Sequence, residues 1–125
     1  MTDDLTLTLT TTHTDGRLAA LRVGGEIDTR TASALRREAL HVIARGHPHL
    51  ILDLTGITFC DSSGFNALIG IMRCATAANG SLTLAAVPDR LSRLLDLTGL
   101  STIMPSYPST EAAMNARLPT TPGPA

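Results

Sequence analysis

Two adjacent serine hydroxyls are the clearest candidates for chemistry in this 125-residue chain, and they lie in the segment Cys60-Asp61-Ser62-Ser63-Gly64. An aliphatic stretch lies upstream, and an apolar pattern of helical spacing follows from Phe65. The segment is therefore predicted to start a helix, where a serine faces solvent beside neighbouring N–H groups that have no partner. Such a position suits a phosphoacceptor. The same Asp-Ser-Ser pattern is also that of an ordinary helix N-cap.

Enzymatic readings of these residues have little support, and no catalytic residue is predicted. A serine hydrolase would need a Gly-x-Ser-x-Gly elbow, and neither this elbow nor a base or an oxyanion hole can be identified around Ser62. A receiver domain is the second alternative, because Asp53 stands near the end of an aliphatic run. The chain contains no lysine, and no acidic pair follows its first predicted strand. A receiver uses both to hold magnesium and the phosphoryl group.

The composition argues against several other classes. The formal charge is −1 and the arginines are dispersed, unlike a nucleic-acid footprint. Cys60 and Cys74 fit no metal-ligand pattern, so they are expected to be reduced thiols of the core. No stretch approaches the about 20 apolar residues of a membrane span, and the acidic start Met1-Thr2-Asp3-Asp4 is unlike a secretory signal. A cytoplasmic protein that is a monomer when unbound is expected.

Hydrophobic periodicity predicts an alternation of strands and helices. Leucines alternating with threonines from Leu5 to Thr10, and an apolar run from Leu18 to Val23, predict a hairpin whose second strand stops at Gly24-Gly25. The other predicted elements are a helix between Asp28 and Gly46 capped by Asp28 or Thr29, a strand from His49 to Leu54, a helix from Ser63 to Ala78, a strand from Ser81 to Val87, a helix from Pro88 to Gly99 with Leu91, Leu94 and Leu95 packed inward, a strand from Ser101 to Met104, and a helix from Ser109 to Ala116.

This order predicts an α/β fold with a mixed sheet of four to five strands, parallel in its later part, and about four helices packed mainly on one face. The domain is expected to cover residues 1–116. The proline-rich tail, residues 117–125, has a composition typical of disorder.

Four segments in combination resemble the bacterial anti-sigma factor antagonists and their STAS domain. The segments are Gly24-Gly25-Glu26-Ile27-Asp28, Leu52-Asp53-Leu54, Phe59-Cys60-Asp61-Ser62-Ser63-Gly64 and Leu94-Leu95-Asp96-Leu97-Thr98-Gly99-Leu100. Each is weak alone, whereas the combination is specific. The resemblance covers about Leu5 to Met114 and implies a STAS-type fold.

The resemblance also implies a function. Ser62, with Ser63 as the fallback, would be phosphorylated by an anti-sigma factor that is also a serine kinase. The unphosphorylated chain would bind this partner and free its sigma factor, and a serine phosphatase of the PP2C type would reverse the modification. ATP would be used by the kinase, and this chain would need no cofactor. STAS domains also serve as regulatory modules of stress-signalling or transport complexes, which is the alternative. The proposed partner-binding residues are Asp28, Asp61, Ser62, Ser63, Gly64 and Asn66.

Phosphorylation would act by charge. A phosphoserine adds roughly −1.5 to −2 charges beside Asp61 and, if the strands pair as in the family, Asp28, so an interface that accepts a neutral serine would be disrupted. One departure concerns partner choice: many relatives have Gly-Leu-Gly where this chain has Gly64-Phe65-Asn66.

Overall fold

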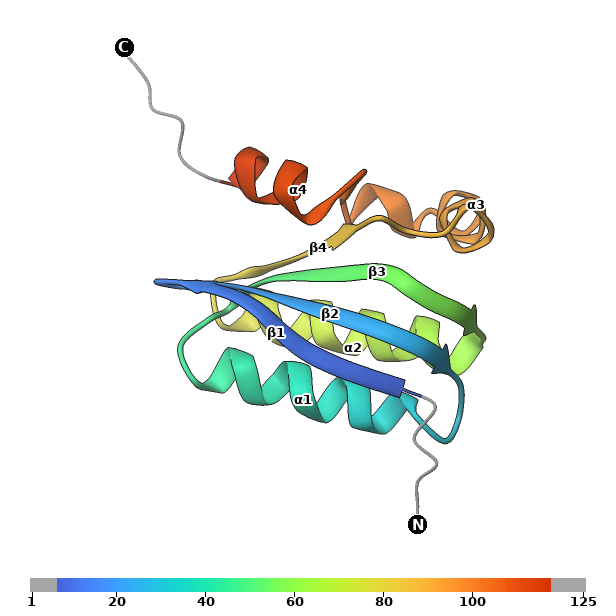
Figure 1. The fold of residues 1–125 in the computed structure, drawn as a ribbon, viewed down its shortest axis with the longest axis horizontal. Coiled ribbons are helices and arrows are strands. Elements are labelled where there is room, and N and C mark those ends of the chain that lie inside the picture. The colour runs from blue at the N-terminus through green and yellow to red at the C-terminus, as the bar shows by residue number, and fades with distance from the viewer. Residues whose placement is uncertain (1–6, 118–125) are drawn as a thin grey trace.

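The structure is a computed structural model that describes residues 7–117 (Figure 1). Its elements are β1 (Leu7–Asp15), β2 (Leu18–Ile27), α1 (Ala32–Ala44), β3 (His49–Cys60), α2 (Ser62–Ala77), β4 (Ser81–Ala85), α3 (Asp89–Thr98), the 3-10 helix η1 (Leu100–Thr102), β5 (Ser106–Tyr107) and α4 (Thr110–Arg117). The predicted order of strands and helices is confirmed, with η1 added. The predicted start of the first strand at Leu5 and the tail after Arg117 lie outside the described residues.

All five strands form one sheet in the order β1-β2-β3-β4-β5. The β1–β2 pair is antiparallel and the later pairs are parallel, as predicted. In Figure 1, α1 and α2 lie side by side under one face of the sheet, whereas α4 lies over the other face. The predicted mixed α/β fold is therefore confirmed. Within residues 7–117 no helix combines the length and the apolar character needed to cross a lipid bilayer.

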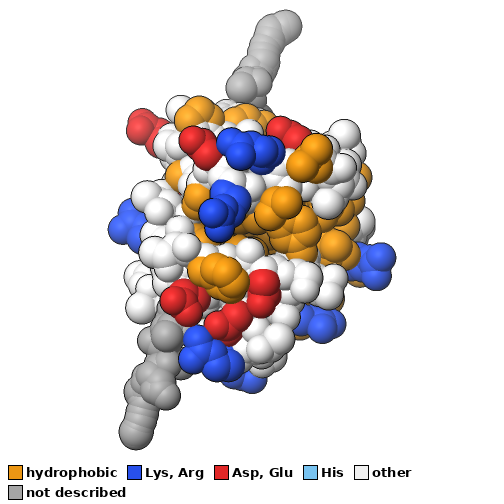
Figure 2. Space-filling model, turned by 90° about the vertical axis from the view of Figure 1, so that its right-hand side faces the viewer, with side chains coloured by type: hydrophobic (Ala, Val, Ile, Leu, Met, Phe, Trp, Pro, Cys, Tyr) orange, Lys and Arg blue, Asp and Glu red, His pale blue; other side chains and the backbone are white. Residues whose placement is uncertain are grey.

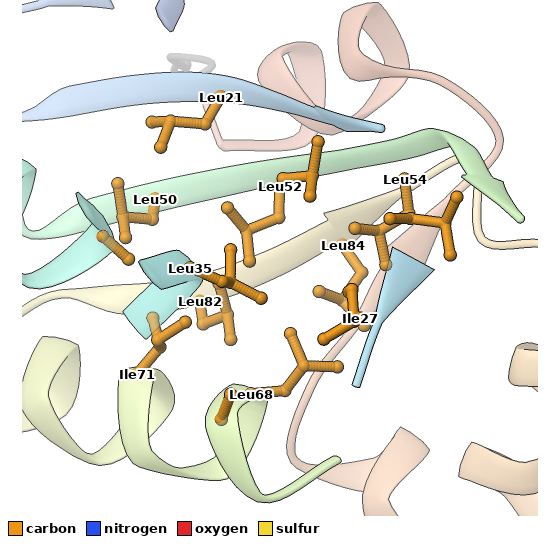
Figure 3. Packing of buried hydrophobic residues seen from close by; sticks show 14 of the residues in the cluster. Leu21, Ile27, Leu35, Leu50, Leu52, Leu54, Leu68, Ile71, Leu82 and Leu84 are labelled. Carbon is orange, nitrogen blue, oxygen red and sulfur yellow. The ribbon is translucent and has the colours of Figure 1, made fainter. Parts of the chain in front are cut away.

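The two faces of β3 separate the two parts of the core. Leu50, Leu52 and Leu54 belong to the larger cluster, together with Leu35 of α1 and Leu68 of α2 (Figure 3). Ile51 points the opposite way and packs with Ala113 of α4. Alternation along one strand thus builds both layers, as expected for a strand covered on both faces.

Strands β2 and β3 are longer than predicted. The prediction that β2 stops at Gly24-Gly25 is wrong, because pairing with β3 continues to the Ile27–Cys60 pair through two register shifts. A Cβ added at Gly56 would lie 3.1 Å from Gly24 Cα, and Gly25 has a φ of 102°. The glycines therefore permit a close, irregular pairing here rather than ending the strand. The segment from Thr55 to Cys60, predicted as a link, is part of β3.

The predicted strand from Ser101 to Met104 is also wrong. Gly99 adopts a left-handed conformation that ends α3, and the chain then forms η1. The Thr102 hydroxyl donates to the carbonyl of Gly99 at 2.7 Å, so local hydrogen bonds occupy this turn. The last strand instead is β5, after Pro105, whose carbonyl accepts from Leu84 N at 2.8 Å.

Asp53 is a buried carboxylate that connects β3 to α4. Its Oδ1 accepts from Thr55 N at 2.9 Å and from Thr55 Oγ1 at 2.6 Å, while its Oδ2 accepts from Thr110 Oγ1 at 2.9 Å. The guanidinium Nε of Arg22 lies 4.0 Å from Oδ2. Burial alone would raise the pKa of Asp53, but the threonine hydrogen bonds and the charge of Arg22 outweigh it and lower the pKa below 3.8. The residue that suggested a receiver domain is therefore engaged in holding α4.

Removing one of these hydrogen bonds is expected to give a pH-dependent loss of stability. We expect Thr110→Val to lower the free energy of unfolding by about 1–2 kcal/mol at neutral pH, because the variant cannot donate to the carboxylate. A lowered pKa in the folded state stabilises the protein above the ordinary pKa, and this stabilisation is lost as the pH falls through the folded-state pKa. Urea denaturation of wild type and variant at neutral and acidic pH measures the difference. If the difference in the free energy of unfolding between wild type and Thr110→Val is the same at neutral and acidic pH, the role of the Asp53 charge is contradicted.

Candidate functional site

The carboxyl ends of β2 and β3 bring two acidic turns together. The strands are parallel and their last pair is Ile27–Cys60. Just beyond this pair, Asp61 N donates to the carbonyl of Ile27 at 3.1 Å. The turn that begins at Asp28 therefore lies beside the start of α2, which is the arrangement that the resemblance implies for Asp28 and Asp61.

The first turn of α2 is capped by Asp61. Its Oδ1 accepts from Ser63 N at 2.8 Å and from Gly64 N at 3.4 Å. The prediction that the N–H groups beside Ser62 are unpaired is therefore wrong for these two, because the preceding carboxylate occupies them. Ser62 is the first residue of the helix, is exposed, and its hydroxyl has no hydrogen-bond partner within residues 7–117. Its hydroxyl is thus free for modification, next to a fixed negative charge.

The turn after β2 holds a second fixed carboxylate. Asp28 Oδ1 accepts from Arg30 N at 2.9 Å and from Thr31 N at 3.3 Å, and Oδ2 lies 2.8 Å from Arg30 Nη2. The hydrogen bond from the Arg30 side chain is the main reason why the pKa of Asp28 lies below its ordinary value of 3.8. The prediction that Asp28 or Thr29 caps the helix is wrong, because the N-cap of α1 is Thr31. The Asp28 side chain instead caps the turn before the helix, and it remains charged at neutral pH.

Gly64 lies under the site rather than on it. The residue is buried, and a Cβ at this position would overlap the Cys60 sulfur and lie 2.8 Å from Ile27 Cγ2. Burial, with a smaller effect of the Asp61 charge, raises the pKa of the Cys60 thiol to about 11. The thiol is therefore protonated at neutral pH. Gly64 contributes by letting α2 approach the ends of β2 and β3.

A shallow groove of about 340 Å³, lined by both polar and apolar side chains, lies between α1 and α2, next to this first turn. Ser33 and Arg36 of α1 line one side, and Ser63 and Asn66 of α2 line the other. The sequence predicted roles for Ser63 and Asn66 but not for Ser33 or Arg36. Their spacing placed them on α1, but only the side-by-side packing of the two helices shows that they face the site.

Exposed apolar side chains flank the site on its other side. Phe59, Leu94 and Leu97 are 45%, 39% and 76% exposed, respectively. Figure 2 shows this end of the molecule, where hydrophobic side chains gather between acidic and basic ones. The prediction that Leu94 packs inward is wrong, because only Leu91 and Leu95 of α3, four residues apart, are buried. The exposure of Phe59 was not predicted, because its segment was predicted to be a link.

Comparison with known proteins identifies the family. The sequence pattern of the STAS domain matches residues 9–113. An anti-sigma F factor antagonist of Paenibacillus polymyxa is 33% identical over 88 residues, which are 70% of this chain and 75% of that protein. The chain belongs to the STAS domain family of anti-sigma factor antagonists.

Solved structures agree with this assignment. The fold of this STAS domain matches an anti-sigma factor antagonist from Mycobacterium paratuberculosis with a TM-score of 0.77 and 31% identity, over 88% of this chain and 92% of that one. The Bacillus cell fate determinant SpoIIAA, solved in its phosphorylated form, has the same fold, with a TM-score of 0.70 and 22% identity, over 88% of this chain and 100% of that one.

The STAS domain places the predicted site residues at one end of the sheet, where the β2–α1 turn meets α2. Two acidic caps, two serines and one asparagine contribute to this surface, and the predicted glycine lies beneath it. We call this surface the switch surface, defined by Asp28, Asp61, Ser62, Ser63 and Asn66.

Proposed function

We propose that this STAS domain binds an anti-sigma factor that is also a serine kinase, frees its sigma factor, and is switched off by phosphorylation of Ser62. The observation that carries the proposal is the exposed hydroxyl of Ser62 at the start of α2, which has no partner among the described residues, next to the fixed carboxylate of Asp61 and near the Asp28 turn. Support comes from the names of the relatives, which are anti-sigma factor antagonists, and from the solved phosphorylated form of SpoIIAA.

Charge explains how one phosphate would act as a switch. Glu26, Asp28 and Asp61 lie near the start of α2. Arg30 pairs with Glu26 at 3.4 Å and with Asp28 at 2.8 Å, and no ion pair to Asp61 is found within residues 7–117. A phosphoserine adds roughly −1.5 to −2 charges to this acidic end. A partner surface matched to a neutral hydroxyl would then face concentrated negative charge, which weakens association by several kcal/mol. The complex would separate without any refolding.

The chemistry itself belongs to the partner. The Ser62 oxygen attacks the γ-phosphorus of ATP held by the kinase, the bond to the β,γ-bridging oxygen breaks, ADP leaves, and the hydroxyl proton passes to a base of the kinase. This chain supplies the nucleophile and no cofactor. A serine phosphatase of the PP2C type would hydrolyse the phosphoserine and restore the binding surface.

The site of modification can be tested with a matched pair of variants. Wild type, Ser62→Ala and Ser63→Ala are incubated with ATP and each anti-sigma factor serine kinase of the source bacterium, and the phosphate is located by mass spectrometry. We expect labelling of wild type and Ser63→Ala and none of Ser62→Ala, because Ser62 is exposed, whereas Ser63 is half-buried, with its N–H held by Asp61. Undiminished labelling of Ser62→Ala would exclude Ser62 as the acceptor. No complex and no labelling with any kinase would overturn the proposed function.

A further inference from the structure

Arg36 lines the groove between α1 and α2, beside Gly70. A Cβ added at Gly70 of α2 would lie 3.3 Å from Arg36 Nε and 3.5 Å from Arg36 Cζ. The guanidinium therefore lies close against α2 where that helix has no side chain. The side chain is exposed, so its guanidinium is accessible to a partner.

The charge of Arg36 is not neutralised by this chain. Within residues 7–117 the structure has no ion pair to Arg36. Helices α1 and α2 together carry three arginines, Arg36, Arg37 and Arg73, and a single acidic residue, Glu38. The switch surface next to them is acidic. Arg36 is the one charged residue among the described residues that line the groove, so the groove attracts a group of negative charge.

We propose that this groove receives an acidic side chain of the anti-sigma factor, whose carboxylate pairs with Arg36. The inference rests on the proposed function and adds a residue and a partner chemistry to it. A guanidinium presents a planar fork of donors that matches a carboxylate. Ser33, Ser63 and Asn66 add hydroxyl and amide donors along the same groove. Its volume of about 340 Å³ leaves room for the side chain of a partner residue.

This pairing gives phosphorylation a second effect. Ser63 lines the groove and Ser62 is its neighbour in the chain, so a phosphate on Ser62 stands close to the carboxylate that the groove holds. Two negative groups would then compete for the same cation. The groove therefore couples partner recognition to the state of Ser62.

The neighbouring arginine provides a control of equal charge. Arg37 is also exposed on α1 but does not line the groove. Dissociation constants are measured by calorimetry between the unphosphorylated chain and the ADP-bound kinase that labels wild type. We expect Arg36→Ala to weaken binding roughly 10- to 100-fold and Arg37→Ala by less than about threefold, because only the first removes a paired cation. Arg36→Lys should restore part of the loss, since lysine keeps the charge but not the fork.

Rescue by charge reversal identifies the bound group. Arg36→Glu should abolish binding, and reversal of one acidic residue of the kinase to arginine should restore it. Equal effects of Arg36→Ala and Arg37→Ala, with wild type still binding, would overturn the inference and leave the proposed function standing. A loss of phosphorylation by Arg36→Ala with unchanged affinity in ADP would also overturn it, because Arg36 would then contact the nucleotide. If wild type forms no complex, the proposed function fails, and the inference fails with it.

Discussion

Replacing Ser62 by aspartate is expected to lower the affinity for the anti-sigma factor by roughly 100-fold or more, while Ser62→Asn, a neutral side chain of the same size, is expected to lower it far less. The aspartate adds one charge next to Asp61 and near Asp28, whose carboxylates are already fixed by hydrogen bonds. Like charges brought together at an interface cost several kcal/mol, and about 2.7 kcal/mol corresponds to 100-fold. Calorimetry or surface plasmon resonance at low and high salt measures both variants. The difference in affinity between the two variants should decrease as the salt concentration rises, because salt screens the added charge.

The same substitution should leave the fold unchanged. Ser62 is exposed at the first residue of α2, and an acidic side chain there interacts favourably with the helix dipole by about 0.3–1 kcal/mol. The far-UV spectrum and the urea midpoint of Ser62→Asp should therefore match or exceed those of wild type. Equal affinity of the aspartate and asparagine variants would contradict the charge mechanism. A weaker affinity together with partial unfolding would instead assign the effect to the fold.

Residues whose role is local were predictable from the sequence. The hydroxyl of Ser62 at a helix start, the capping carboxylate of Asp61 and the left-handed Gly99 all follow from short patterns with a known geometry. The alternation of elements followed from periodicity in the same way. The lengths of the strands did not follow from periodicity, because β2 and β3 extend beyond their apolar runs only by pairing with each other, across Gly24 and Gly56.

Features that depend on contacts between distant segments could not be predicted. Arg36 looks like any solvated arginine until α2 places Gly70 against it. Phe59 and Leu94 form one exposed apolar area only because the end of β3 lies beside α3, and the two residues line one small groove there. The hydrogen bonds from the Ser63 and Gly64 amides to Asp61 are local. The Asp-Ser-Ser pattern nevertheless does not tell whether these amides remain available to bind another anion. The surface residues that can recognise a partner in this domain are therefore brought together largely by the tertiary structure.

Two glycines of α2, Gly64 and Gly70, are expected to respond in opposite directions when each is replaced by alanine. Gly64→Ala should lower the free energy of unfolding by about 1–3 kcal/mol, because the new methyl group must displace Cys60 and the fully buried Ile27. Gly70→Ala should leave stability unchanged or raise it by up to about 1 kcal/mol, since alanine favours the helix and the nearest atom belongs to the flexible Arg36. Urea denaturation of both variants measures these differences.

The two glycine variants are also expected to differ in how they affect partner binding. Displacing Ile27 and Cys60 moves the ends of β2 and β3, which hold the Asp28 turn and Asp61 in position, so Gly64→Ala should weaken binding through the whole switch surface. Gly70→Ala should weaken binding only by moving Arg36, so it should have no further effect in the Arg36→Ala background. Equal stability of Gly64→Ala and wild type would contradict the packing role of Gly64. An additive effect of Gly70→Ala on Arg36→Ala would show that Gly70 acts on binding by another route than the placement of the guanidinium.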